Sequence, residues 1–240
     1  MIPKIIHYCW FGGKEKPALA VKCIESWKKY CPDYEIIEWN ESNFSLDYCD
    51  YVKEAFEEKK WAFITDVVRL HALVNFGGIY MDTDVEVVKP LDEFLELKAF
   101  SGFQTVDSVP TGIMAAEKGH PLFARLLADY DGAHFRKDGK IDMETNVVKI
   151  TNACLEYGLV LNNQKQEIGG FTLYPFDYFC AKDIQTGKIV ATKNTYTIHH
   201  FAGSWVTPRN RFNTKVDRAI RKIFGEKFSK KIKSLLKRKK

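Results

Sequence analysis

The chain has 240 residues, 45% hydrophobic and 28% charged, which is the composition of a folded globular protein and excludes an intrinsically disordered one. No apolar run approaches the roughly 20 residues needed to cross a bilayer, and no secretory signal is recognisable, so the sequence predicts a cytoplasmic protein. The net charge of +5 is uneven: residues 215–240 carry +10, which leaves −5 for the remaining 214 residues.

Hydrophobic patterns predict alternating strands and helices along the chain. The clearest helix is expected in 61–78, where apolar residues recur every three or four positions and Gly77-Gly78 provides a stop. The predicted strands are 2–9, 34–39, 79–88, 171–180 and 195–201, with more strand inside 99–117; the predicted helices are 17–30, 61–78, 121–130 and 144–157, with one or two short ones inside 40–60. This alternation favours an α/β layered sheet.

Two carboxylates stand directly after the apolar residues Ile79-Tyr80-Met81, at the end of a predicted buried strand. Asp82 and Asp84 can converge on one cation if the chain bends as it leaves that strand. Because burying two unpartnered acids costs roughly several kcal/mol, we expect a cation or a basic partner. Carboxylate oxygens suit Mg²⁺ or Mn²⁺, and these ions bind diphosphates. Such triplets also occur by chance on exposed strands, so the triplet alone leaves this alternative open.

The helix before this strand carries a second pair of charges. Asp66 and Arg69 are three positions apart and therefore share a helix face. They form either an ordinary ion pair or part of a ligand site. In the second case Arg69 contacts a phosphate or a sugar hydroxyl, and Asp66 accepts hydrogen bonds from sugar hydroxyls.

The run from Ala62 to Val85 resembles the signature of family 32 glycosyltransferases. These are sugar transferases with a DxD motif, related to yeast Golgi mannosyltransferases, bacterial capsular-polysaccharide enzymes and the glucosyltransferase domains of clostridial toxins. Two other segments, Ile2 to Trp10 and His199 to Trp205, also resemble that family. The segments that carry the resemblance are IPKIIH and Trp10, Thr65-Asp66, Arg69, Gly77-Gly78-Ile79-Tyr80, Asp82-Thr83-Asp84 and HHFAGSW.

The resemblance implies a GT-A type, Rossmann-like nucleotide-sugar-binding domain over 1–214, with transfer that retains the anomeric configuration. It implies Mn²⁺ or Mg²⁺ held by Asp82, Asp84 and His200, with His199 as the alternative third ligand.

The same resemblance implies how the donor binds. Trp10 is expected to stack on the base, and Asp66, Arg69 and Asp82 to contact the donor. Ser204 and Trp205 are expected to meet the diphosphate when a C-terminal loop closes. A UDP-sugar is the first expectation for the donor and a GDP-sugar the second.

The basic segment 215–240 has apolar residues at helical spacing among its Lys and Arg residues. This pattern predicts an amphipathic helix on an anionic membrane surface, at the inner face of the membrane. The alternative is a solvated helix that packs partly on the body of the protein. A nucleic-acid partner is not expected, because the rest of the chain is acidic.

The sequence therefore predicts a hexosyltransferase of surface-polysaccharide synthesis, for example of a capsule, acting on a glycan or lipid-linked acceptor. Two other functions remain open at this point. Paired carboxylates also serve metal-dependent phosphohydrolases and nucleotidyltransferases. A non-catalytic, membrane-associated binding module is the third possibility.

Overall fold

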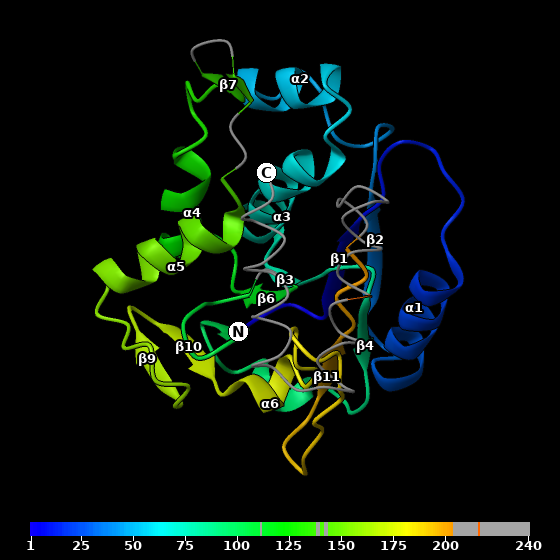
Figure 1. Ribbon diagram of the computed structural model, residues 1–240, viewed down its shortest axis with the longest axis vertical. Coiled ribbons are helices and arrows are strands. Elements are labelled where there is room, and N and C mark those ends of the chain that lie inside the picture. Colours follow the sequence, from blue (N-terminus) through cyan, green and yellow to red (C-terminus); the bar gives the residue numbers. More distant parts are fainter. Residues whose placement is uncertain (111, 138–139, 142–143, 204–215, 217–240) are drawn as a thin grey trace.

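The computed structural model describes residues 1–110, 112–137, 140–141, 144–203 and 216. Within them the chain folds into a mixed β-sheet with helices on both faces (Figure 1). Ser204 and Trp205 lie outside the described residues, and so does the expected helix over 215–240 apart from Val216.

The main sheet has seven strands in the order β2-β1-β3-β6-β5-β10-β9. β1 pairs in parallel with β2 and β3, and β10 pairs in parallel with β5. β6 runs antiparallel between β3 and β5, and β9 is antiparallel to β10. The strands are β1 (Ile5–Cys9), β2 (Glu35–Trp39), β3 (Gly78–Met81), β5 (Ala99–Gly102), β6 (Ile113–Ala116), β9 (Gln166–Ile168) and β10 (Phe171–Tyr174).

Two smaller antiparallel pairs lie outside this sheet. β4 (Val85–Val87) pairs with β11 (Thr197–His199), and β7 (Arg136–Lys137) pairs with β8 (Lys140–Ile141). The pairing of β4 with β11 matters for the site, because it holds residues 197–199 beside the segment that follows β3.

Two hydrophobic cores lie on opposite faces of the main sheet, because successive strand residues point to opposite faces. Ile79 and Met81 of β3 enter the core beneath α1, and Tyr80 enters the core beneath α3. Helices α2 to α5 gather on the second face, and α1 lies on the first (Figure 1). The helices are α1 (Ala18–Tyr30), α2 (Asp50–Glu57), α3 (Trp61–Phe76), α4 (Pro121–Ala128), α5 (Asn146–Glu156), α6 (Phe176–Phe179) and the 3₁₀ turn η1 (Asp92–Phe94).

The α3–β3 junction consists of Gly77 and Gly78. Gly77 ends α3 with φ 71°, and Gly78 begins β3 with φ 105°; both angles lie in the region that disfavours residues with a Cβ atom. A Cβ on Gly78 would lie 2.6 Å from the Ile5 carbonyl oxygen of β1. The two glycines thus let the buried helix α3 turn directly into the centre of the sheet.

Two predicted strands differ from the structure. The predicted strand 79–88 is broken after Met81, where the chain turns and the Val85 amide donates to the Asp82 carbonyl at 2.9 Å. The predicted strand 171–180 ends at Tyr174, because Pro175 has no N–H for the ladder and starts the short helix α6. Within the described residues, no helix combines the length and the apolar character needed to span a bilayer.

Candidate functional site

The parallel strands β1, β2 and β3 end at one edge of the main sheet. Trp10 follows β1 there, and its amide donates to the Trp39 carbonyl at the end of β2. Asp82 follows β3, and its amide donates to the Gly112 carbonyl at 2.8 Å, just before β6 begins. The ends of β1, β2 and β3 and the start of β6 therefore meet at the edge of the sheet where the DxD triplet begins.

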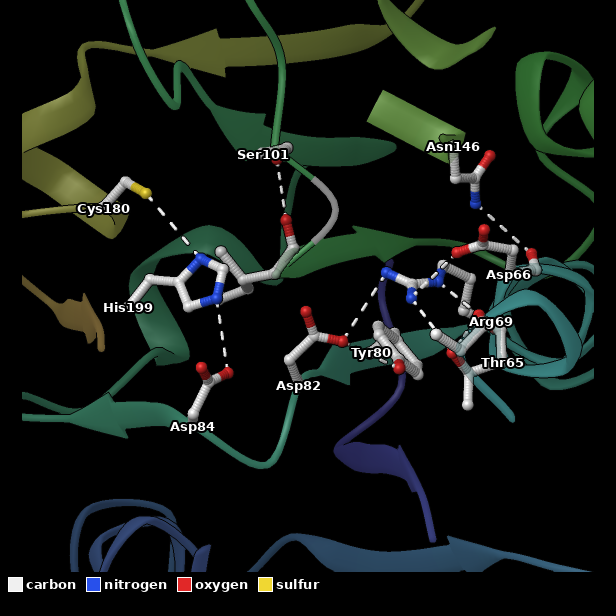
Figure 2. Close-up of polar contacts among 12 residues, drawn as sticks. Thr65, Asp66, Arg69, Tyr80, Asp82, Asp84, Ser101, Asn146, Cys180 and His199 are labelled. Atoms are coloured by element: carbon white, nitrogen blue, oxygen red, sulfur yellow. Dashed lines mark hydrogen bonds and ion pairs between the residues drawn. The ribbon is translucent and has the colours of Figure 1, made fainter. Parts of the chain in front are cut away.

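The turn between β3 and β4 brings the two carboxylates of the triplet together. Asp82 and Asp84 keep 27% and 16% of their side-chain surface exposed, so both remain accessible to a ligand. The bend predicted from the sequence is present, and an oxygen of each carboxylate lies within 4.8 Å of the other. In Figure 2 the Asp82 carboxylate contacts Arg69, and the Asp84 carboxylate contacts His199.

His199 completes a group of three potential metal ligands. Strand β11 pairs with β4 so that His199 stands opposite Val85, and this register sets its Nε2 3.3 Å from Oδ1 of Asp84. One ligand atom each from Asp82, Asp84 and His199 lie within 4.8 Å of one another.

The neighbouring His200 points elsewhere. Its Nε2 lies 2.7 Å from the Glu86 carboxylate, which Lys22 also contacts at 2.8 Å. Adjacent residues of a strand point to opposite sides, so only one of the two histidines can face Asp84. The expectation that His200 is the third ligand does not agree with this geometry, which gives that place to the alternative, His199.

Asp84 and His199 form a buried pair. Burial alone would raise the pKa of the Asp84 carboxyl, but His199 and the Ala202 amide lower it to about 2. Burial alone would lower the pKa of His199, but Asp84 raises it well above its usual value. The opposite charges of the two side chains therefore stabilise the pair.

Arg69 connects the helix face to the triplet. Its Nη2 lies 3.1 Å from Oδ1 of Asp66, and its Nη1 lies 3.6 Å from Oδ1 of Asp82 (Figure 2). Its Nε also donates to the Thr65 carbonyl at 3.2 Å. The Arg69 side chain is only 5% exposed, so it contacts both carboxylates from the protein interior.

Burial raises the pKa of the Asp66 carboxyl to about 6, although the charge of Arg69 lowers it. The desolvation of this carboxylate therefore exceeds the effect of its ion pair. An acid in such an environment gains from additional hydrogen-bond donors, and sugar hydroxyls are donors of this kind.

Tyr80 has a contact that the sequence patterns did not assign. Its buried hydroxyl donates to Oδ1 of Asp82 at 2.9 Å, and its ring lies 4.6 Å from the Arg69 guanidinium. Burial raises the pKa of Tyr80, which keeps the hydroxyl protonated as a donor. This contact could have been predicted from the sequence, because Tyr80 and Asp82 are two positions apart and residues with this spacing on a strand share a face.

Asn146 begins α5 and lies against α3. Its Nδ2 donates to the Asp66 carbonyl at 3.3 Å, while its buried Oδ1 has no hydrogen-bond partner among the residues that the structure describes. Trp10 is partly buried at the end of β1, and its Nε1 donates to the Lys14 carbonyl at 2.5 Å. Neither side chain belongs to the group of three ligands.

The donor set of the cluster fits the metal that the resemblance implies. Two carboxylates and one imidazole are ligands that Mn²⁺ accepts, and the carboxylates also suit Mg²⁺. Both carboxylates are held from the protein side, Asp82 by Tyr80 and Arg69 and Asp84 by the Ala202 amide at 2.7 Å. Such supporting contacts orient metal ligands.

Comparison with known proteins places this geometry in context. Residues 17–101 match the family described as the glycosyltransferase sugar-binding region containing a DXD motif. That segment contains Asp66, Arg69, Asp82 and Asp84. The resemblance found in the sequence is thereby confirmed.

Two yeast proteins match part of the chain. Inositol phosphoceramide mannosyltransferase 3 of Schizosaccharomyces pombe is 30% identical over 130 residues, which cover 52% of this chain and 36% of that protein. Mannosyl phosphorylinositol ceramide synthase CSH1 of Saccharomyces cerevisiae is 26% identical over 158 residues, which cover 60% and 39%. The chain thus spans little more than a third of the length of these relatives.

Among solved structures, the PaToxG glycosyltransferase has the same fold, with a TM-score of 0.50 and 21% identity over 65% of this chain and 69% of that one. The described residues have an α/β fold, and the cluster of Asp82, Asp84 and His199 contains both acids of the DXD motif in the matched region. Residues 17–101 thus form a family 32-like glycosyltransferase sugar-binding region, and the chain is distantly related to the yeast mannosyltransferases.

Proposed function

We propose that this chain is a metal-dependent hexosyltransferase that takes its sugar from a nucleoside diphosphate sugar. The observation that carries the proposal is the cluster of Asp82, Asp84 and His199, whose ligand atoms lie within 4.8 Å of one another. The buried Asp66–Arg69 pair lies beside this cluster and reaches Asp82. A cation site next to a buried pair of opposite charges suits a diphosphate joined to a sugar.

The three clustered residues would hold the cation. When bound, Mn²⁺ or Mg²⁺ supplies positive charge that stabilises the departing diphosphate. His199 takes the place of His200 in this proposal, because His200 is engaged with Glu86. Tyr80 keeps Asp82 turned toward the cluster through its hydroxyl.

Asp66 is proposed to accept hydrogen bonds from the donor sugar. Arg69 orients Asp66 and Asp82, because its guanidinium already contacts both carboxylates and is almost fully buried. Trp10 is proposed to stack on the base from the end of β1. Ser204 and Trp205, which lie outside the described residues, are proposed to contact the diphosphate.

The names of the yeast relatives refer to mannosyl transfer, and this supports a mannosyl donor within the hexose class. The nucleotide is proposed to be UDP or GDP, and the acceptor a glycan or a lipid-linked saccharide. Retention of the anomeric configuration belongs to the same proposal. So does peripheral attachment to the inner face of an anionic membrane through 215–240.

The decisive experiment compares the wild type with Asp84→Asn. Sugar transfer from UDP- and GDP-hexoses is measured with and without Mn²⁺, together with Mn²⁺ affinity by calorimetry. We expect Asp84→Asn to lose about a hundredfold or more in transfer, the scale seen when one group that stabilises developing charge is removed. Asp92→Asn is the matched control, because Asp92 is 48% exposed and pairs with Lys4 on the surface.

Two outcomes would contradict the proposal, and a third would remove one part of it. An absence of sugar transfer in the wild type, with the same Mn²⁺ affinity in Asp84→Asn, would indicate a binding module. Turnover of many phosphate esters without any sugar acceptor would indicate a phosphohydrolase. An inverted product anomer, read by proton NMR, would remove retention while leaving the transferase in place.

A further inference from the structure

Phe201 follows β11 with a backbone conformation that its side chain disfavours. Its φ is 52°, in the left-handed region where the Cβ atom of an L-residue approaches the following carbonyl oxygen. Among the described residues, the other non-glycine residues with positive φ are Lys59 and Asn163. A large apolar residue in this conformation is unusual, and such outliers gather at functional sites.

This conformation determines what reaches Asp84. The His200 amide still follows the antiparallel ladder and donates to the Asp84 backbone carbonyl at 2.9 Å. After the left-handed residue, the next amide, that of Ala202, donates to Oδ2 of the Asp84 side chain at 2.7 Å. The change in chain direction at Phe201 thus moves the contact from the Asp84 backbone to its carboxylate.

The ring of Phe201 also restrains the other member of the buried pair. It lies 4.1 Å from the His199 ring, with an angle of 30° between the two planes. The Gly112 backbone also lies close to the imidazole, because a Cβ built on Gly112 would stand 2.6 Å from Nδ1. The imidazole is therefore restrained by Phe201 as well as by the β6 side of the sheet.

Within the part of the chain that the structure describes, Phe201 belongs to neither hydrophobic core, and its side chain is only partly buried. Its ring contact there is with the His199 imidazole. A requirement for core packing therefore does not explain why an aromatic residue occupies a strained position here.

We propose that Phe201 is a positioning residue for the metal cluster: its left-handed backbone places the Ala202 amide on Asp84, and its ring fixes the orientation of the His199 imidazole. The inference rests on the proposed function, because it concerns how tightly the cluster binds a divalent cation. Phe201 supports the metal ligands and itself contacts neither the cation nor the donor.

The test measures Mn²⁺ affinity by electron paramagnetic resonance for the wild type and three variants of the full chain. Phe201→Tyr keeps an aromatic ring, and its backbone must adopt the same disfavoured positive φ. Phe201→Gly adopts positive φ easily but has no ring. Phe201→Val lacks the ring, and its β-branched side chain also opposes positive φ.

We expect Phe201→Tyr to bind Mn²⁺ as the wild type does, and Phe201→Val to bind about ten- to a hundredfold more weakly, the range for loss of a contact that supports a metal ligand. Phe201→Gly should fall between them. Phe56→Val is the control, because Phe56 is an exposed aromatic residue of α2. Metal-free thermal unfolding reports any structural loss separately from affinity.

Wild-type affinity in both Phe201→Gly and Phe201→Val would overturn the inference, as would binding by the valine variant as tight as that of the glycine variant. Should the valine variant fail to fold, the glycine variant decides the matter, because wild-type affinity without the ring contradicts it. If the wild type itself binds no Mn²⁺, the proposed function fails first. The two failures are therefore distinguishable.

Discussion

Gly112 determines how closely the backbone before β6 approaches the His199 ring. We expect Gly112→Ala to displace the imidazole, because the new Cβ would stand 2.6 Å from Nδ1. Mn²⁺ affinity should fall about tenfold or more, as for other contacts that orient metal ligands. Calorimetric titration measures this loss.

The control for Gly112→Ala is a double-mutant cycle with His199→Ala. In the His199→Ala background the extra methyl group has room, so Gly112→Ala should have almost no further effect on the free energy of unfolding. An equal loss of stability in both backgrounds would show that the methyl group clashes with something other than the imidazole.

Asp66 should give the stability of the protein an unusual pH dependence. Its pKa is raised to about 6 in the folded protein from 3.8, so between these values the folded state holds a proton that the unfolded state has lost. The carboxyl therefore contributes a stability that is present below pH 3.8 and is lost as the pH rises toward 6. The size of this loss is about 2 to 3 kcal/mol, since one pKa unit corresponds to about 1.4 kcal/mol.

Urea unfolding of the wild type and Asp66→Asn across this pH range checks the prediction. The free energy of unfolding of the wild type minus that of Asp66→Asn should decline as the pH rises through this window. Asp84 has its shift in the opposite direction, to about 2, so its effect falls below pH 3.8 and does not overlap. A difference that stays constant with pH would contradict the burial of the Asp66 charge.

The sequence identified the carboxylates of the site but not all of its supporting residues. Asp82 and Asp84 stood out because they follow the apolar residues of a buried strand, where two acids need a cation or a basic partner. The choice between His199 and His200 depends on the register of β11 against β4, which local sequence does not encode. Gly112 acts on His199, which is distant in the chain, so no short motif marks it. Phe201 lies in the HHFAGSW segment, but the segment does not reveal that its backbone is left-handed or that the Ala202 amide reaches Asp84.

At the scale of elements, the α3–β3 junction aligns Arg69 with Asp82. We expect Gly78→Ala to destabilise the fold by about 2 kcal/mol or more, because it combines strain at positive φ with a close contact. The added Cβ would lie 2.6 Å from the Ile5 carbonyl oxygen, where β1 and β3 pair. Urea denaturation gives the change.

Gly158→Ala is the matched control for this substitution. Its φ of 90° is close to that of Gly78, but an added Cβ meets no atom within 4 Å. The difference between the two variants therefore isolates the contact with β1. Equal losses would mean that the close approach of α3–β3 to β1 contributes nothing.

Periodicity predicted most helices and strands, and it failed where a turn interrupts an apolar run. Helix α3 was expected from its apolar spacing, and Gly77 ends it as predicted. The run 79–88 reads as one strand because Val85 and Val87 continue the apolar pattern. Its division into β3 and β4 depends on partners, since β4 pairs with β11 outside the main sheet.

At the scale of the molecule, charge is concentrated in 215–240, which carries +10 against −5 for the rest. We expect a chain that ends at Thr214 to lose binding to phosphatidylserine vesicles, since each basic residue near such a surface contributes about 1 kcal/mol. Co-sedimentation with vesicles measures the loss, and phosphatidylcholine vesicles provide the uncharged comparison. Mn²⁺ affinity should be unchanged, and vesicle binding that survives the truncation would remove this segment as the membrane contact.

Sequence patterns did not predict the order of the strands in the sheet. Alternating strands and helices predicted an α/β layer, and the sheet is α/β. The antiparallel placement of β6 between β3 and β5 depends on contacts between distant segments. The GT-A-like fold was expected from the resemblance, not from the hydrophobic pattern.

The pairing of β11 with β4 joins segments made at different times on the ribosome. Ala202 and Asp84 are 118 residues apart, so at about 5 to 20 residues per second roughly 6 to 24 s separate their synthesis. Throughout that interval the nascent chain holds both acids of the triplet but lacks the imidazole and the amide that complete their surroundings. A growing polypeptide therefore acquires the full cluster only when translation has passed this late strand, and a product that stops earlier lacks it.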